Sequence, residues 1–272
     1  MLCFSIDLCS SFNNTSVYIF ADSILVMCGA RDNEWFRGWF NSPYYHILYK
    51  HRDDAEAANF LDALMTELNL QSGSEVLDLA CGKGRHSIYL HQKGYQVTGL
   101  DLSEESIKLA NEHSTEGLEF YTGDMRSFQL EKKYSAILNL FTSFGYFDEK
   151  SDNLKVIQCI HQHLDEDGLF VMDYFNPSTI CCKKHSGDLQ IDGIQFNITK
   201  KLEGEHVIKE IKVLDQGFRE KFMEKVQLFT LPEILNMLES SGFRFLTAKG
   251  NYAMDDFHEN SSERMIIIAQ KS

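Results

Sequence analysis

Two spacings of hydrophobic residues divide the chain, one helical and one strand-like. Between residues 33 and 70, apolar and aromatic side chains recur at three- and four-residue steps, the spacing of amphipathic helices. Because proline cannot donate the backbone hydrogen bond that a helix interior requires, Ser42-Pro43 should separate two helices. We therefore expect residues 31–70 to form an N-terminal helical cap.

Short apolar runs alternate with helical segments over residues 76–174. Strands separated by helices form right-handed βαβ units, which place the strands in one parallel sheet with helices on both of its faces. We expect strands at residues 76–80, 96–100, 118–121, 134–140 and 169–174, and helices at 85–93, 104–112 and 152–164. The predicted fold class is therefore α/β.

The spacing changes to a period of two between residues 179 and 230. The runs at 193–199, 207–213 and 222–229 fit half-exposed antiparallel strands, and a helix at 232–240 and strands at 243–249 and 264–270 follow. We predict one domain over residues 31–272, with a small antiparallel β insertion at about 179–230. Its apolar face must be buried on the main domain or on a second copy of the chain, so a homodimer is one expectation.

Residues 1–30 show neither spacing, and we expect them to be a lead outside the core. One hypothesis is a start codon assigned too early, with Met27 as the alternative start. The most hydrophobic stretch, 17–28, contains Asp22 and has no basic segment before it, so it predicts neither a membrane span nor a secretory signal. A cytoplasmic location is the expectation.

Composition narrows the choice of partners. A formal net charge of -14, with no Lys- or Arg-rich stripe, argues against nucleic acid and leaves a small molecule as the expected partner. We interpret the charge-rich residues 200–212 as a solvated strand face. Seven cysteines without a CxxC pair argue against a disulfide framework and a zinc site, so no metal is expected, even at Cys181-Cys182.

The strongest chemical signal is a glycine-rich turn after a buried strand. Gly82 and Gly84 let the backbone approach a ligand closely, and Asp78 before them can orient the turn and accept a hydrogen bond from an ammonium group. Asp101 ends the next strand, where a carboxylate can accept both hydroxyls of a ribose. Asp124 follows the third strand, within reach of an adenine amino group. Together these strand ends predict an adenosine pocket.

Two adenosine cofactors fit such a pocket, NAD and S-adenosylmethionine (SAM). A dinucleotide fingerprint requires a third glycine at position 87, where this chain has a serine. A carboxylate at position 78 suits the ammonium group of SAM instead. SAM is therefore the expected cofactor, and an NAD-dependent oxidoreductase is the less favoured alternative.

In these motifs the sequence resembles class I SAM-dependent methyltransferases of the small-molecule kind. The matching segments are residues 78–84, 99–103, 123–125, 139–145 and 229–243, and the resemblance spans residues 32–272. It implies a Rossmann-like sheet of seven strands with the last strand inserted antiparallel, SAM across the carboxyl ends of the strands, and an acceptor pocket beside it under the β insertion. The implied enzyme methylates N or O of a small molecule; a catalytically silent SAM-binding module is the alternative.

The resemblance also implies roles for single residues. Ala80 and Gly82 would offer backbone groups to the methionine part of SAM, and Leu140 would line the sulfonium. Asp101 would bind the ribose hydroxyls, Leu102 would pack on adenine, and Asp124 with Met125 would hold the adenine edge. In the cap, the residues that would reach the SAM carboxylate are Tyr45, Tyr49 and Arg52.

Methyl transfer needs a general base only if the acceptor must lose a proton. The side chains considered as bases are His46, His86, Asp173 and Tyr174. Asp173 is the preferred catalytic candidate, because it lies where the fifth strand opens toward the acceptor.

Overall fold

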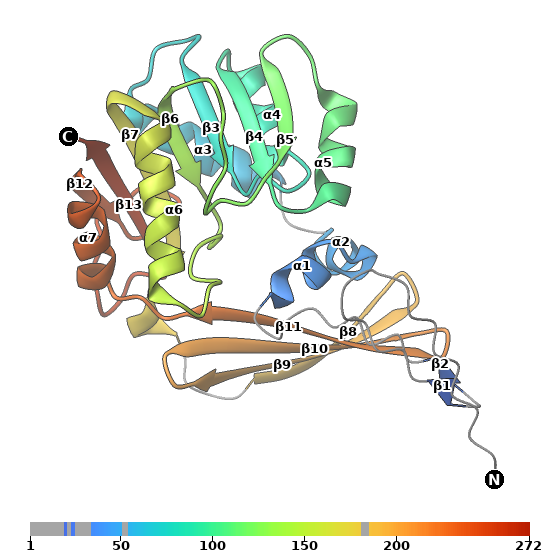
Figure 1. Cartoon of the computed structure of the whole chain (residues 1–272). Helices are drawn as coiled ribbons and strands as arrows, with labels where there is room; N and C mark the ends of the chain where they lie inside the picture. Colours follow the sequence, from blue (N-terminus) through green and yellow to red (C-terminus); the bar gives the residue numbers. More distant parts are fainter. Residues whose placement is uncertain (1–18, 21–22, 25–33, 51–53, 181–184) are drawn as a thin grey trace, which may run out of the picture.

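A seven-stranded sheet organises the molecule, in the order β12-β13-β7-β6-β3-β4-β5 (Figure 1). The computed structural model describes residues 19–20, 23–24, 34–50, 54–180 and 185–272. The strands are β3 (Glu75–Leu79), β4 (Gln96–Asp101), β5 (Leu118–Thr122), β6 (Tyr134–Asn139), β7 (Leu164–Phe175), β12 (Phe243–Lys249) and β13 (Arg264–Lys271). Strand β13 runs antiparallel to both β7 and β12, whereas β7, β6, β3, β4 and β5 pair in parallel. The predicted sheet is confirmed.

Helices cover both faces of this sheet and define two hydrophobic cores. One core joins α6 (Lys150–His163) and α7 (Leu231–Ser240) to side chains such as Leu77 and Ile137. The other joins α3 (Asp54–Leu68), α4 (Arg85–Gln92) and α5 (Glu104–Ala110) to Val76 and Ala136. Neighbouring strand residues thus point to opposite cores, which explains why these strands are apolar throughout.

The predicted cap region, residues 31–70, contains three helices rather than two. Only the short helices α1 (Trp35–Phe40) and α2 (Pro43–Leu48) form the cap, because α3 packs in a core of the main sheet. As predicted, they separate at Ser42-Pro43: the Ser42 hydroxyl accepts a hydrogen bond from the Tyr44 amide at 3.2 Å, and proline occupies the first helical position. Figure 1 shows the cap between the seven-stranded sheet and a second, smaller sheet.

The second sheet contains four antiparallel strands in the order β11-β10-β9-β8. They are β8 (His185–Ile191), β9 (Ile194–Glu203), β10 (His206–Asp215) and β11 (Phe218–Gln227). Three of them correspond to the predicted runs. Strand β8 was not predicted, because its sequence lacks alternation and contains Gly187; pairing with β9 determines its conformation.

In the N-terminal lead, only β1 (Ile19–Phe20) and β2 (Ser23–Ile24) belong to the described residues, and they pair with each other. The assignment of residues 1–30 to a separate lead, and the domain boundaries, stay predictions. Within the described part of the chain, no helix combines the length and hydrophobicity needed to cross a membrane.

Candidate active site

A cavity of about 820 Å³ opens at the carboxyl ends of the parallel strands. Most of its lining comes from the loops after β3 to β7, the cap helices, and the β9, β10 and β11 strands of the second sheet, and Arg264 of β13 also lines it. The predicted site residues that line it are Tyr45, Tyr49, Ala80, Gly82, Asp101, Leu102, Asp124, Met125 and Leu140. Arg52 lies outside the described residues.

The glycine-rich turn follows β3 with left-handed backbone at Ala80, Gly82 and Gly84, whose φ angles are +67°, +56° and +80°. A Cβ on Gly82 would meet nothing within 4 Å, so the turn leaves open space where it borders the cavity. A Cβ on Gly84 would lie 2.5 Å from the ring of Phe120. Gly84 is therefore needed for packing against β5 and, contrary to our expectation, does not line the cavity.

Asp101, at the end of β4, holds the turn in place. Its two carboxylate oxygens accept hydrogen bonds from the backbone amides of Gly82 and Ser103, each at 2.8 Å. Burial raises its pKa, and the amide donors act in the opposite direction. Each oxygen keeps capacity for a second donor, so the carboxylate can also accept ribose hydroxyls.

Asp78 is buried inside β3, with 1% of its surface exposed. Its carboxylate accepts a hydrogen bond from the Ser87 hydroxyl at 2.6 Å, which joins the strand to the start of α4. Burial raises its pKa to about 6. This geometry fits the expected role of Asp78 in orienting the glycine-rich turn. Asp78 does not line the cavity, however, so its expected contact with an ammonium group is not supported.

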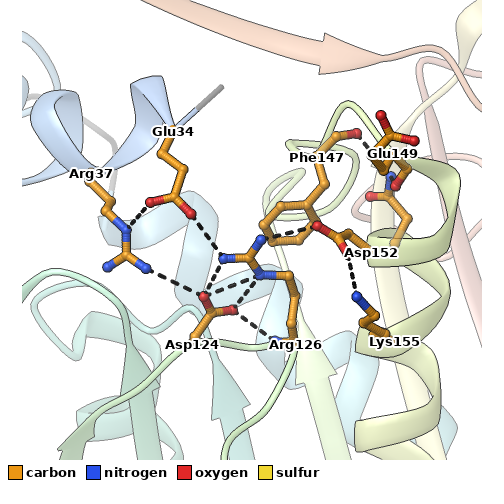
Figure 2. Close-up of polar contacts among 9 residues, drawn as sticks. Glu34, Arg37, Asp124, Arg126, Phe147, Glu149, Asp152 and Lys155 are labelled. Atoms are coloured by element: carbon orange, nitrogen blue, oxygen red, sulfur yellow. Dashed lines mark hydrogen bonds and ion pairs between the residues drawn. The ribbon is translucent and has the colours of Figure 1, made fainter. Parts of the chain in front are cut away.

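Asp124 belongs to an ion-pair network at the cap side of the cavity, drawn in Figure 2. Arg126 contacts Asp124 at 2.6 Å, Asp152 of α6 at 3.2 Å and Glu34 before α1 at 3.3 Å. Burial opposes ionisation of Asp124, but its bonds to Arg126 outweigh this, and its pKa is lowered. The carboxylate therefore ties the β5 loop to the cap, and its contact with adenine stays a prediction.

The predicted base Asp173 does not face the cavity. It is 0% exposed, and its carboxylate is held by Arg264 at 2.6 Å, by the Phe141 amide at 2.8 Å and by the Tyr252 hydroxyl at 3.3 Å. Only Arg264 and Phe141 of this group line the cavity. We correct the expectation accordingly: Asp173 positions its neighbours rather than accepting a proton from an acceptor.

Of the other side chains considered as bases, His46 and His86 line the cavity, whereas Tyr174 does not. Tyr174 is buried away from the cavity and donates to the Gln227 carbonyl. His86 stacks on Phe141 with ring centroids 4.9 Å apart. Burial, together with the charge of Lys83, lowers the pKa of His46 to about 4, so it is neutral but a weak base near pH 7.

The second sheet contributes charged residues that we did not predict. Glu224 of β11 accepts hydrogen bonds from the Trp39 indole at 2.9 Å and the Tyr49 hydroxyl at 2.5 Å, and lies 3.5 Å from the ammonium of Lys209. These groups come together only across strands and from the cap, so no local sequence motif could have found them. Tyr49 is thereby drawn toward the second sheet, and its contact with SAM stays a prediction.

Known proteins of similar sequence and structure identify the class. The profile of a family described as a methyltransferase domain matches residues 70–212, more than half of the chain, and the chain belongs to this family. The protein is a SAM-dependent methyltransferase, and SAM is its cofactor. The alternative of an NAD-dependent oxidoreductase is thus not supported.

Among its relatives is the glycine/sarcosine N-methyltransferase of Aphanothece halophytica, 25% identical over an alignment of 254 residues that covers 88% of this chain and 90% of that protein. A dTDP-3-amino-3,4,6-trideoxy-alpha-D-glucopyranose N,N-dimethyltransferase of Streptomyces venezuelae is 29% identical over 134 residues, 49% of this chain and 56% of that protein. A SAM-dependent methyltransferase structure from Clostridium acetobutylicum matches the fold with a TM-score of 0.71 at 20% identity, covering 84% of this chain and 96% of that one.

The residues present fit SAM. The open side of the turn at Gly82 leaves room for the methionine part, and Asp101 can accept hydroxyls while Leu102 and Met125 offer apolar surface to a flat ring. We propose that these residues hold the cofactor, with Ala80 and Leu140 beside its reactive end.

Replacing Asp101 by Ala should raise the Kd for SAM by at least about tenfold, because charge-assisted hydrogen bonds worth about 1.5–3 kcal/mol each are lost. Titration calorimetry measures this, with Glu104→Ala, at the first position of α5, as the matched control. Unchanged affinity in a folded Asp101→Ala variant would refute the assigned ribose contact.

Asp78 should make stability depend on pH. Because its folded pKa of about 6 exceeds the unfolded value of 3.8, its contribution to the free energy of unfolding is complete below about pH 4 and is lost as the pH rises to about 6. Relative to Asp78→Asn, the wild type should lose about 3 kcal/mol between these pH values, as measured by urea unfolding. Parallel pH profiles of the two proteins would contradict the expectation.

Breaking the Asp173–Arg264 pair should be costly. Asp173→Ala leaves a largely buried guanidinium without its carboxylate, which should lower the free energy of unfolding by about 3 kcal/mol or more. Chemical denaturation checks this, and Asp165→Ala, an exposed residue on the same strand, should change stability by less than about 0.5 kcal/mol. Equal effects of the two substitutions would show that the pair has no special role.

Proposed function

We propose that this methyltransferase transfers the methyl group of SAM to an amine nitrogen of a small molecule. The observation that carries the proposal is an aromatic wall and a carboxylate in the lining of the same cavity. Both features stabilise positive charge, which is what an amine acquires when it is methylated.

The aromatic wall consists of cavity-lining rings from the cap and from the loop after β6. Phe40 contacts Tyr45, Tyr146 and Trp35 with ring centroids 5.0, 5.6 and 5.7 Å apart, and Trp35 lies 5.4 Å from Tyr146. Aromatic faces attract cations, and such a wall also keeps water away from the reacting atoms.

Glu224 supplies the carboxylate. The Trp39 indole and the Tyr49 hydroxyl both donate to its Oε1, which fixes the carboxylate in the cavity lining. When bound, SAM supplies a methyl group activated by a sulfonium. As positive charge develops on the acceptor nitrogen, a fixed carboxylate and aromatic faces stabilise it more than they stabilise the neutral amine, and this difference lowers the barrier.

A hydroxyl acceptor is less well served by this site. An alkyl amine is largely protonated near pH 7, but it can lose that proton to solvent before it reacts, and the neutral amine is then nucleophilic. A hydroxyl, by contrast, must lose its proton to a base as it reacts. Asp173 and Tyr174 do not line the cavity. His46 and His86 do, but the lowered pKa of His46 makes it a weak base, and the ring of His86 is stacked on Phe141. Of the two reactions, amine methylation is therefore the one that does not depend on a strong base in the cavity lining.

The named substrates of the two relatives support the same chemistry. One is named for methylating glycine and sarcosine and the other for methylating an amino sugar, so both have amine acceptors. These acceptors define the first compounds to test on this protein.

The test uses labelled SAM and pairs of acceptors that differ only in the nucleophile: glycine with glycolate, and an amino sugar with the corresponding hydroxyl sugar. In each pair that reacts, the labelled methyl group should appear on the amine and not on the corresponding hydroxyl compound. Glu224→Gln should lower kcat/KM for that amine about tenfold or more, because a charge interaction in the transition state is lost. Glu220→Gln, on the exposed end of the same strand, is the control. Label transferred only to hydroxyls would overturn the proposal.

A further inference from the structure

Two lysines of the second sheet, Lys200 on β9 and Lys209 on β10, line the cavity. From the sequence, residues 200–212 were interpreted as a solvated strand face. Lys209 is half-buried in the cavity lining, which corrects this interpretation for that side chain, whereas Lys200 is exposed where it borders the cavity, as the interpretation expected.

Strand pairing places the two lysines and Glu224 in one row. Lys200 is directly opposite Lys209, and Lys209 is directly opposite Glu224 on the next strand. Residues opposite each other in adjacent strands share a face of the sheet. Across the cavity-facing side of the second sheet, the row therefore consists of Glu224, Lys209 and Lys200, in that order.

The two lysines differ in their partners. Lys209 lies 3.5 Å from Glu224 and donates a hydrogen bond to the Tyr49 hydroxyl. Lys200 forms no ion pair with any residue that the structure describes, whereas its neighbour Lys201, on the opposite face, pairs with Glu203 at 3.0 Å and with Glu210 at 3.3 Å. Two like charges directly opposite each other repel, so the row carries one positive charge that an anion would balance.

The charge of the cavity lining is opposite to that of the whole chain. The chain has a net charge of -14, yet the cavity lining contains six cations and three carboxylates, Asp101, Asp124 and Glu224. The cations are Lys50, Lys83, Arg85, Lys200, Lys209 and Arg264. Three of the cations are balanced by carboxylates: Arg264 by the buried Asp173, Lys50 by Asp192 and Lys209 by Glu224. Asp124 is likewise balanced by Arg126, so Lys83 and Lys200 supply the excess positive charge. A positively lined cavity in an acidic protein attracts an anionic ligand and repels a purely cationic one.

We propose that Lys200, together with Lys209, forms an anion subsite that binds a carboxylate or phosphate group of the acceptor, so that the acceptor is an amine that also carries an anionic group. This inference rests on the proposed amine methylation and names the class of amine. Lys200 is the specificity-determining residue, because Lys209 is already paired with Glu224.

The carboxylate of SAM is the rival occupant of this subsite. We expect that carboxylate near the cap and the turn at Gly82, whereas Lys200 belongs to the second sheet. The two occupants are separated by measuring cofactor and acceptor affinities in the same variant.

The kinetic test compares amines with and without the anionic group: glycine with glycinamide, and a nucleoside-diphosphate amino sugar with the free amino sugar. The wild type should prefer the anionic member, and which pair reacts distinguishes carboxylate from phosphate. Lys200→Gln should raise the KM for the anionic member about tenfold with little change in kcat. Lys200→Arg keeps the positive charge, so its KM should lie close to that of the wild type. Lys201→Gln should match the wild type.

A binding arm decides the inference even if no amine reacts. Acetate and inorganic phosphate are titrated into protein saturated with S-adenosylhomocysteine, and the better-bound anion should lose affinity in Lys200→Gln but not in Lys201→Gln. Absence of turnover with all amines would refute the amine proposal, while this loss would still support the subsite. The subsite would be overturned if Lys200→Gln changed neither anion binding nor the KM. It would also be overturned if the only effect of Lys200→Gln were a weaker affinity for SAM.

Discussion

The ion pair between Asp173 and Arg264 determines the shape of the active-site edge of the sheet. It joins β7 to β13, and Asp173 also accepts the amides of Phe141 and Thr142, through its carboxylate and its carbonyl respectively. Arg264 donates to the Thr142 hydroxyl at 3.0 Å. Phe141 and Thr142 both have left-handed backbone, with φ of +57° and +62°, which costs about 1–3 kcal/mol per residue. The pair stabilises this turn, which in turn places Leu140 and Phe141 in the cavity wall.

A second constraint acts on the opposite wall, where the cap depends on the inserted sheet. Trp39 is 1% exposed, in a core with Leu48 of the cap and Phe196 and Ile211 of the second sheet. Tyr44 donates to Asp215 at 3.1 Å, which adds a polar tie between them. The cap and the inserted sheet therefore pack as one layer, and Figure 1 shows this layer facing the carboxyl ends of the main strands. The loops of the main sheet form one wall of the cavity, and this layer forms most of the opposite wall.

The sequence predicted the features that depend on residues close to one another along the chain. Strands and helices of the main sheet, the break at Ser42-Pro43, and the positions of Gly82 and Asp101 could be predicted, because spacing and strand ends determine them. Asp173 was correctly placed at the end of its strand, but its role was not, since its partner Arg264 lies 91 positions away. Glu224 was missed for the same reason. Pairing between strands decides which charges meet, and a single sequence does not reveal that pairing.

The order of charges in the second sheet also bears on orientation. Adjacent strands lie about 4.8 Å apart, so Glu224 on β11 and Lys200 on β9 are separated by about 10 Å at the backbone, with Lys209 between them. An acceptor whose amine and anionic group lie far enough apart to reach Glu224 and Lys200 matches this row in one direction, whereas the reversed molecule meets like charge at both ends. Direction matters in methyl transfer, because the nitrogen must lie in line with the bond that breaks. A lysine that binds the far end of the acceptor therefore acts on geometry as well as on affinity, and this gives a physical reason to place positive charge in a cavity that also holds a sulfonium.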